Sequence, residues 1–323
     1  IGGVLSLSFF SALTAMLFLW LVQGMEQRRS TLSLSVILMV LTISGYLLQQ
    51  VNWTKDIGKP LTVALIQPNI AQNEKWSVEK RRTILTQLAA QTEAYWGHDI
   101  IIWPEAAVPS TPKRIPVFMQ NLERKANDSG STLLTGIITQ DGEQGRYYNS
   151  VLAVGDQSGQ YHKTRLVPFG EYVPLESLLR GLIQFFDLPM SSLSVGPSNQ
   201  IPLTVQKQLI ATAICYEVVY PDLVARISRE ASLIVTVSND TWFGESLGPL
   251  QHMQMVQMRA LENAKPIIRG TNNGISGLVD QRGNIYGRMD QNSIDELSGV
   301  VQPRAGQTPF SITGSWPIIF LSW

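Results

Sequence analysis

Long uncharged runs at both ends of the chain constrain its fold more than any other feature. Residues 1–22 carry no charged side chain, residues 31–50 carry none, and residues 305–323 are again uncharged. Because about 20 consecutive apolar residues span a bilayer core, the first two runs predict transmembrane helices and the last predicts the start of another. A secretory signal peptide fits the first run less well, since no basic segment precedes it and no small-residue cleavage site follows it. We expect further spans before Ile1, so that the sequence is N-terminally truncated.

The loop between the first two runs predicts the topology. It contains Arg28 and Arg29, and short loops that carry arginine or lysine tend to stay in the cytoplasm. The second span then delivers the chain to the other side of the membrane, and the final span returns it. We therefore expect two transmembrane helices within residues 1–52, an extracytoplasmic domain over residues 60–303, and the start of a C-terminal span over residues 307–323.

The segment between the spans alternates strand-like and helix-like patterns. Strands are predicted at residues 62–66, 100–103, 133–139, 150–154, 209–214, 233–237, 267–269 and 275–279. Helices are predicted at residues 78–95, 116–127, 222–230 and 252–263. This alternation is typical of a layered α/β domain, and about 240 residues are enough for one core.

Composition disfavours several classes of function. The formal net charge is zero, and the lysines and arginines form no nucleic-acid-binding stripe. Three widely spaced histidines, at positions 98, 162 and 252, make a zinc site improbable. No phosphate-binding loop and no dinucleotide fingerprint occur. We therefore expect no metal and no organic cofactor.

One carboxylate, one amine and the single thiol of the chain each follow a strand-like run. They are Glu105, Lys163 and Cys215. Taken one at a time, they are more often a surface carboxylate, a solvated cation and a small buried apolar residue. Because ligands bind at the carboxyl ends of strands in open α/β sheets, their shared placement favours a site.

The segments around these residues carry a family resemblance. Trp103-Pro104-Glu105, Tyr161-His162-Lys163 and Ile214-Cys215-Tyr216-Glu217 resemble the motifs of the nitrilase (carbon-nitrogen hydrolase) superfamily. The run KTRLVPFGEYVP at 163–174, together with the flanking spans, resembles the apolipoprotein N-acyltransferase family within it. The resemblance implies an αββα sandwich and a Glu–Lys–Cys triad at Glu105, Lys163 and Cys215.

The chemistry of the implied triad is that of acyl transfer. A thiolate at Cys215 would attack an acyl carbonyl and form a thioester. Glu105 would accept and return the proton, and Lys163 would stabilise the oxyanion, with the backbone N–H of Tyr216 as a second donor.

Further residues are predicted to support the triad. The resemblance implicates Glu171, Tyr216 and Glu217, and it matches an early tryptophan of the family to Trp76. Asn239 and Trp242 follow a strand-like run and are expected to shape the pocket, with structural packing as the alternative. Arg259 and Glu262, spaced i and i+3, are expected to form a structural ion pair.

The implied substrates are lipids. The family transfers an acyl chain from a phospholipid, typically phosphatidylethanolamine, to a lipoprotein with a diacylglyceryl cysteine, in the bacterial inner membrane. Within the apolar stretch 178–190, Phe185 and Phe186 are predicted to form a lipid-access arm, with core packing as the alternative. We expect the protein to be a monomer and to bind the membrane. We expect it to bind no nucleic acid.

Three other classes of protein remain open. A membrane-anchored amidase would use water as the second nucleophile. A binding or scaffold protein would retain the fold without catalysis. A transporter is disfavoured because the two N-terminal spans carry no internal charge.

Overall fold

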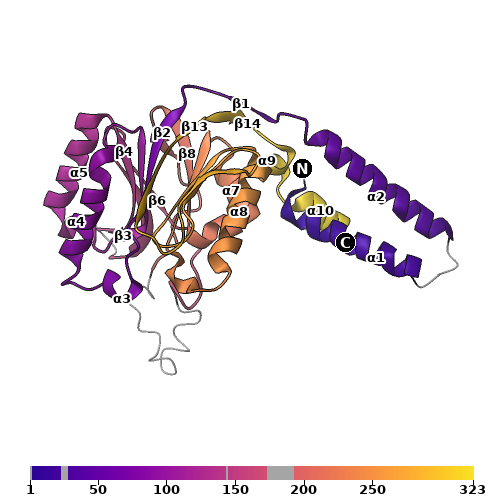
Figure 1. Ribbon diagram of the computed structural model, residues 1–323, viewed down its shortest axis with the longest axis horizontal. Helices are drawn as coiled ribbons and strands as arrows, with labels where there is room; N and C mark the ends of the chain where they lie inside the picture. Colours follow the sequence, from indigo (N-terminus) through magenta and orange to yellow (C-terminus); the bar gives the residue numbers. More distant parts are fainter. Residues whose placement is uncertain (1, 23–27, 143–144, 173–192) are drawn as a thin grey trace.

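The structure, a computed structural model, describes residues 2–22, 28–142, 145–172 and 193–323. Within these residues two six-stranded sheets pack face to face, and helices cover both outer faces. Figure 1 shows the layers side by side, with α4 and α5 on one flank and α7 and α8 on the other. The predicted αββα sandwich is confirmed.

The first sheet has the order β13-β2-β3-β4-β5-β6. Its central strands β2, β3 and β4 run parallel, and the strands outside them are antiparallel. The bounds are β2 Leu61–Gln67, β3 Ile100–Val108, β4 Thr132–Gln140, β5 Tyr147–Val154, β6 Gly159–His162 and β13 Asp295–Val301.

The second sheet has the order β12-β11-β10-β9-β8-β7, and β8, β9 and β10 are its parallel strands. The bounds are β7 Leu203–Val205, β8 Gln208–Ile214, β9 Leu233–Ser238, β10 Ile267–Thr271, β11 Gly277–Val279 and β12 Ile285–Arg288. Parallel strands are covered on both faces, so they are predominantly apolar. This explains why the sequence pattern predicted them. It missed the short strands β6, β7 and β12, and it missed β13, whose side chains are mostly exposed or half-buried.

Helices cover the two outer faces and close the core. The bounds are α3 Gln72–Lys75, α4 Arg81–Thr92, α5 Pro116–Ser129, α7 Pro221–Ile227 and α8 Gly248–Asn263, with short 3₁₀ turns η1 Glu93–Tyr95, η2 Pro112–Arg114, η4 Cys215–Val219 and η5 Asp240–Phe243. The inner faces of the sheets share one apolar cluster, and each helix pair packs on a cluster of its own. The sandwich therefore holds the strand ends rigidly.

Two long helices stand beside the sandwich (Figure 1). They are α1 Gly3–Val22 and α2 Arg28–Leu48. Residues 3–20 of α1 are long and apolar enough to cross a membrane, whereas the apolar stretch of α2, residues 32–48, is shorter. The predicted helices are thus present, and their insertion in a membrane stays a prediction.

The C-terminal segment forms two short helices. β1 Thr54–Asp56 pairs with β14 Arg304–Gly306, and α9 Pro309–Thr313 and α10 Trp316–Leu321 follow. Gly314, with a φ of 61°, separates the two helices. α9 packs on α7 and α8, and the ring of Phe310 is buried. α10 begins at Trp316, within residues 307–323. That this segment starts a membrane span stays a prediction.

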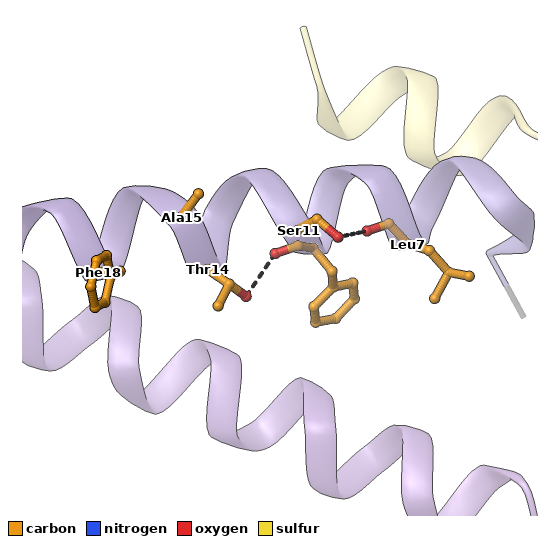
Figure 2. Close-up of a pocket in the computed structure, with 6 residues that line it drawn as sticks. Leu7, Ser11, Thr14, Ala15 and Phe18 are labelled. Atoms are coloured by element: carbon orange, nitrogen blue, oxygen red, sulfur yellow. Dashed lines mark hydrogen bonds between the residues drawn. The ribbon is translucent and has the colours of Figure 1, made fainter.

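A groove of about 590 Å³ runs along α1. Figure 2 shows its lining side chains, among them Leu7, Thr14 and Phe18, spaced along one helix. The hydroxyls of Ser11 and Thr14 donate to backbone oxygens four residues earlier, at 2.9 Å and 2.8 Å. Polar groups in a bilayer must be satisfied internally, so these bonds suit α1 to an apolar surrounding.

One buried ion pair ties α1 to the sandwich. Arg259 and Glu262 of α8 lie 2.6 Å apart, Nε to Oε2, as their spacing predicted. Glu262 Oε1 also accepts a 2.7 Å hydrogen bond from the backbone N–H of Val4. Val4 lies in the first turn of α1, where the backbone N–H groups have no acceptor within the helix.

Candidate active site

Glu105 lies inside β3, whereas the sequence pattern placed it just beyond the strand. The register between β3 and β4 shifts after Trp103 and resumes at Val108. Pro104 has no N–H to donate to a ladder, and Ala106 has a φ of 45°. The resulting bulge takes Glu105 out of the regular pairing and directs its side chain toward polar partners instead.

Glu105 and Lys163 form a buried ion pair. Lys163 follows β6, and its Nζ lies 3.3 Å from Glu105 Oε1 and 2.8 Å from Glu171 Oε1. Asn149 of β5 donates to both carboxylates, at 2.7 Å and 2.9 Å. The N–H of Asn239, at the end of β9, donates to Glu105 Oε2 at 2.8 Å. Elements of both sheets thus hold one carboxylate, which satisfies the requirement that buried charges be paired and hydrogen-bonded.

The charges of this pair are set by their neighbours. Burial disfavours the charged form of Glu105, but the Lys163 charge and the Asn149 hydrogen bond hold its pKa below the ordinary value. Burial also disfavours the charged form of Lys163, yet the charges of Glu105 and Cys215 hold its pKa above the usual lysine value. At neutral pH the pair is a carboxylate and an ammonium, so Glu105 is able to accept a proton.

Cys215 occupies a turn that few residues adopt. It follows β8, opens η4, and has a φ of 55°. Non-glycine residues at positive φ are strained and concentrate at functional sites. Burial and the nearby Glu105 charge raise the pKa of Cys215 to about 12. The resting group at neutral pH is therefore a thiol.

Glu217 holds the turn after Cys215 in place. Its Oε1 accepts from the N–H and hydroxyl of Thr164, both at 2.7 Å, and its Oε2 accepts from the N–H of Ile214 at 2.8 Å. The Tyr161 hydroxyl donates to the same carboxylate, at 3.0 Å from Oε2. Because Thr164 follows Lys163, this carboxylate couples the lysine loop to the cysteine loop.

A second buried network lies behind Cys215, and the sequence did not indicate it. Arg269 donates to Asp240 at 2.7 Å, and the hydroxyl of Ser238 donates to the other Asp240 oxygen. The Ser238 hydroxyl also lies 3.7 Å from Cys215 Sγ. His252 Nε2 lies 3.2 Å from the carbonyl oxygen of Cys215. Since a carbonyl only accepts, Nε2 carries the proton.

The remaining nitrogen of His252 then acts as an acceptor. Its Nδ1 lies 3.1 Å from Arg269 Nη2, which can only donate. Burial and the Arg269 charge lower the pKa of His252, consistent with a neutral ring. The network thus supports the strained backbone of Cys215 through one hydrogen bond.

Lys75 is a further residue that the sequence prediction missed. The side chain is 1% exposed, and its Nζ donates to the backbone oxygen of Glu105 at 2.9 Å. Trp76, the predicted residue, is half-buried at the end of α3. The only feature of the sequence that could have pointed to Lys75 is its position directly before Trp76, a residue that was predicted to belong to the site.

The other predicted residues differ in placement. The backbone N–H of Asn239 donates to Glu105 Oε2 at 2.8 Å. Its side-chain amide donates to Gln72 Oε1, also at 2.8 Å. Tyr216 and Trp242 are exposed, and the Tyr216 ring packs edge-on against Tyr220. Phe185 and Phe186 of the predicted arm lie outside the described residues. Among the residues described, no group of three or more His, Cys, Asp and Glu side chains could hold a metal ion.

Curated relatives share the sequence over almost its whole length. An apolipoprotein N-acyltransferase from Pseudomonas syringae pv. tomato is 43% identical over 98% of this chain and 63% of its own length. Proteins of the same name from Azotobacter vinelandii and Vibrio parahaemolyticus are 42% and 38% identical, and this chain covers 64% of each. The chain thus spans somewhat less than two thirds of these relatives.

Solved structures share the fold at low identity. Nit3 of Saccharomyces cerevisiae, a member of the nitrilase superfamily, matches with a TM-score of 0.58 and 17% identity over 78% of this chain and 93% of its own. An amidase variant from Nesterenkonia sp. AN1 matches with a TM-score of 0.53 and 15% identity over 81% of this chain and 100% of its own. The carbon-nitrogen hydrolase family model matches residues 62–309, which include both sheets and the helices that cover them. Because this match covers more than half of the sequence, the chain belongs to the carbon-nitrogen hydrolase family.

Proposed function

We propose that this chain is the catalytic part of an apolipoprotein N-acyltransferase. It would transfer a fatty acyl chain from a phospholipid, phosphatidylethanolamine in the first instance, to the α-amine of an S-diacylglyceryl cysteine at a lipoprotein N-terminus. The observation that carries the proposal is the buried Glu105–Lys163 ion pair at the site of the chain's single cysteine. The relatives at 42–43% identity support the same reaction.

The first half-reaction makes a thioester on Cys215. Glu105 removes the thiol proton as sulfur attacks the ester carbonyl, and the tetrahedral oxyanion is stabilised by Lys163 and the N–H of Tyr216. When the C–O bond breaks, Glu105 returns the proton to the leaving alkoxide. A lysophospholipid departs, and the acyl chain remains on sulfur.

The second half-reaction transfers the acyl chain to an amine. The neutral α-amine attacks the thioester carbonyl, Glu105 accepts the amine proton, and the C–S bond breaks. The proton then returns to sulfur, which regenerates the thiol. Exclusion of water would protect the thioester between the two steps.

A membrane location supports lipid substrates. α1 is long and apolar enough to span a bilayer, and α10 beside it exposes Trp316 and Phe320. A catalytic domain attached at both of its ends would lie at the bilayer surface, where donor and acceptor lipids are concentrated. We place the sandwich on the extracytoplasmic side of the bacterial inner membrane, in a protein that works as a monomer.

The test is intact-protein mass spectrometry after incubation with phosphatidylethanolamine in the absence of an acceptor. We expect one fatty-acyl mass increment on Cys215, removed on addition of a diacylglyceryl-cysteine peptide and absent from Cys215→Ala. Glu105→Gln should fold normally and acylate at least a hundredfold more slowly, since general acid–base groups contribute about 10²–10⁴ in rate.

Other outcomes would reject the proposal. Release of ammonia or free acid from small amides, without an acyl adduct, would indicate the amidase alternative. Normal lipoprotein maturation supported by Cys215→Ala would indicate a scaffold role.

A further inference from the structure

The candidate site contains a second buried amine that the proposed triad does not use. Lys75 ends α3, is 1% exposed, and donates through Nζ to the backbone oxygen of Glu105 at 2.9 Å. Lysine is almost never fully buried without a partner. A carbonyl oxygen provides a hydrogen bond but no compensating charge. The reason for placing an ammonium group here must therefore lie in the charges around it.

The hydrogen-bonded cluster of Glu105, Lys163 and Glu171 contains more negative than positive charge. Glu105 and Glu171 supply two negative charges, and Lys163 supplies one positive charge. With Lys75 protonated, this cluster is neutral while Cys215 is a thiol. Transfer of the thiol proton to Glu105 creates one negative charge and removes another, so the cluster and Cys215 together stay neutral during attack. Without Lys75 this cluster would carry one more negative charge in both states, which a buried environment penalises.

We propose that Lys75 is the second counter-charge of this site, which stabilises the ionised form of Cys215 in addition to fixing the backbone of Glu105. The inference rests on the proposed function for its catalytic consequence, but the ionisation of the thiol is measurable without any substrate.

The ionisation behaviour of Lys75 supports this role. Burial lowers the pKa of Lys75 to about 8, while the charges of Glu105 and Cys215 act to raise it. Coupling between two titrating groups is reciprocal. If charge on Cys215 stabilises protonated Lys75, then protonated Lys75 stabilises charge on Cys215 equally.

Other charged groups also lie near the thiol. Glu217, two residues further along, is buried, burial raises its pKa, and hydrogen bonds from Ile214 and Thr164 satisfy its oxygens. Glu105, Asp240 and Glu171 raise the pKa of Cys215, and Lys163 lowers it. Asp240 is balanced by its own partner, Arg269, at 2.7 Å. Lys75 is therefore the one cation at the described site whose charge is expected to be lost between neutral and mildly alkaline pH.

The test is the rate of Cys215 alkylation by iodoacetamide in the detergent-solubilised protein, measured from pH 6.5 to 9.5 by peptide mass spectrometry. Lys75→Met keeps the length of the side chain and removes the charge. We expect Lys75→Met to react about tenfold more slowly than the unaltered protein at pH 7, the effect of about one pKa unit on the thiolate population. The ratio of the two alkylation rates, unaltered protein to Lys75→Met, should shrink toward one as the pH rises through about 8, where Lys75 itself loses its charge.

Two variants separate charge from packing. Lys75→Arg should react faster with iodoacetamide than Lys75→Met across the whole pH range, because arginine stays protonated. Lys265→Met is the matched control: Lys265 is 2% exposed, its Nζ also donates to backbone oxygens, and burial likewise lowers its pKa to about 8. It should lose thermal stability without a change in alkylation.

The outcomes distinguish this inference from the proposed function. Equal alkylation of Lys75→Met and the unaltered protein at pH 7 would overturn the counter-charge role, as would an equal slowing in Lys265→Met. A slower, pH-dependent alkylation in a protein that forms no acyl adduct from phospholipid would support Lys75 and reject the acyltransferase.

Discussion

At the scale of single residues, an ion pair holds one of the buried charges near Cys215. Asp240 is the clearest case, because burial opposes its charge and yet the Arg269 charge holds its pKa below the ordinary value. The pair lies behind Cys215, since Arg269 donates to His252 Nδ1 and His252 Nε2 donates to the Cys215 carbonyl. Its function is to keep a strained turn in one conformation.

Removing one partner of this pair should therefore be costly. Arg269→Met leaves Asp240 buried and unpaired, and we expect a loss of about 3–5 kcal/mol in the free energy of unfolding. The double variant Arg269→Met with Asp240→Asn should recover a large part of that loss.

The pH dependence gives a second readout for the same pair. A depressed carboxyl pKa contributes stability above its ordinary pKa, which is lost as the pH falls. In Arg269→Met the unpaired Asp240 carboxyl takes up a proton more readily, so the deficit of this variant in the free energy of unfolding should be smaller at pH 4 than at pH 7. Thermal unfolding at pH 7 and pH 4 would measure both effects, and a double variant no more stable than the single one would contradict the pairing argument.

At the scale of elements, the bulge in β3 determines where Glu105 points. β4 approaches this bulge at Gly136, where an added Cβ would lie 2.2 Å from the Pro104 oxygen and 2.6 Å from the Glu105 Cα. Real side chains essentially never approach so closely, so only glycine lets the two strands pack at this point.

Gly136→Ala should displace the Glu105 backbone and abolish its contacts. We expect acyl-adduct formation to fall at least a hundredfold, since a misplaced base contributes little. Gly130→Ala is the control: this C-cap glycine has a φ of 69° and open space around it. It should cost about 1 kcal/mol of stability and leave the adduct unchanged. Equal activity of both variants would show that β3 tolerates the shift.

At the scale of the whole molecule, the sandwich and the long helices meet different surroundings. Met39 in the middle of α2 is 57% exposed, and Val117 on α5 is 69% exposed. If α2 lies in the bilayer, an exposed apolar side chain there faces lipid, whereas the same exposure on α5 faces water.

Aspartate at these two positions should therefore have opposite consequences. Met39→Asp should reduce membrane insertion, because a charged residue at the centre of a span costs about 2.5–3.5 kcal/mol. Val117→Asp should leave insertion and stability almost unchanged. The fraction of protein that stays in membranes after alkaline carbonate extraction measures the difference, and equal retention would argue against a lipid environment for α2.

Features that depend on local pattern were predictable from sequence. The parallel strands are continuous apolar runs because both of their faces are buried, and the long helices are uncharged over most of a span. Glu105, Lys163 and Cys215 were identifiable because each lies in a short motif shared with a family. Edge strands such as β6 and β7 were missed because they span only four and three residues.

Contacts between distant segments depended on the tertiary structure alone. Asn149 bridges Glu105 and Glu171, and Lys75 reaches Glu105 from α3; neither follows from sequence spacing. By itself the sequence determined the layers, the apolar helices and the three side chains of the proposed triad, because each leaves a local pattern. The tertiary structure decided which charges neighbour the thiol, because the packing of one sheet against the other sets those distances.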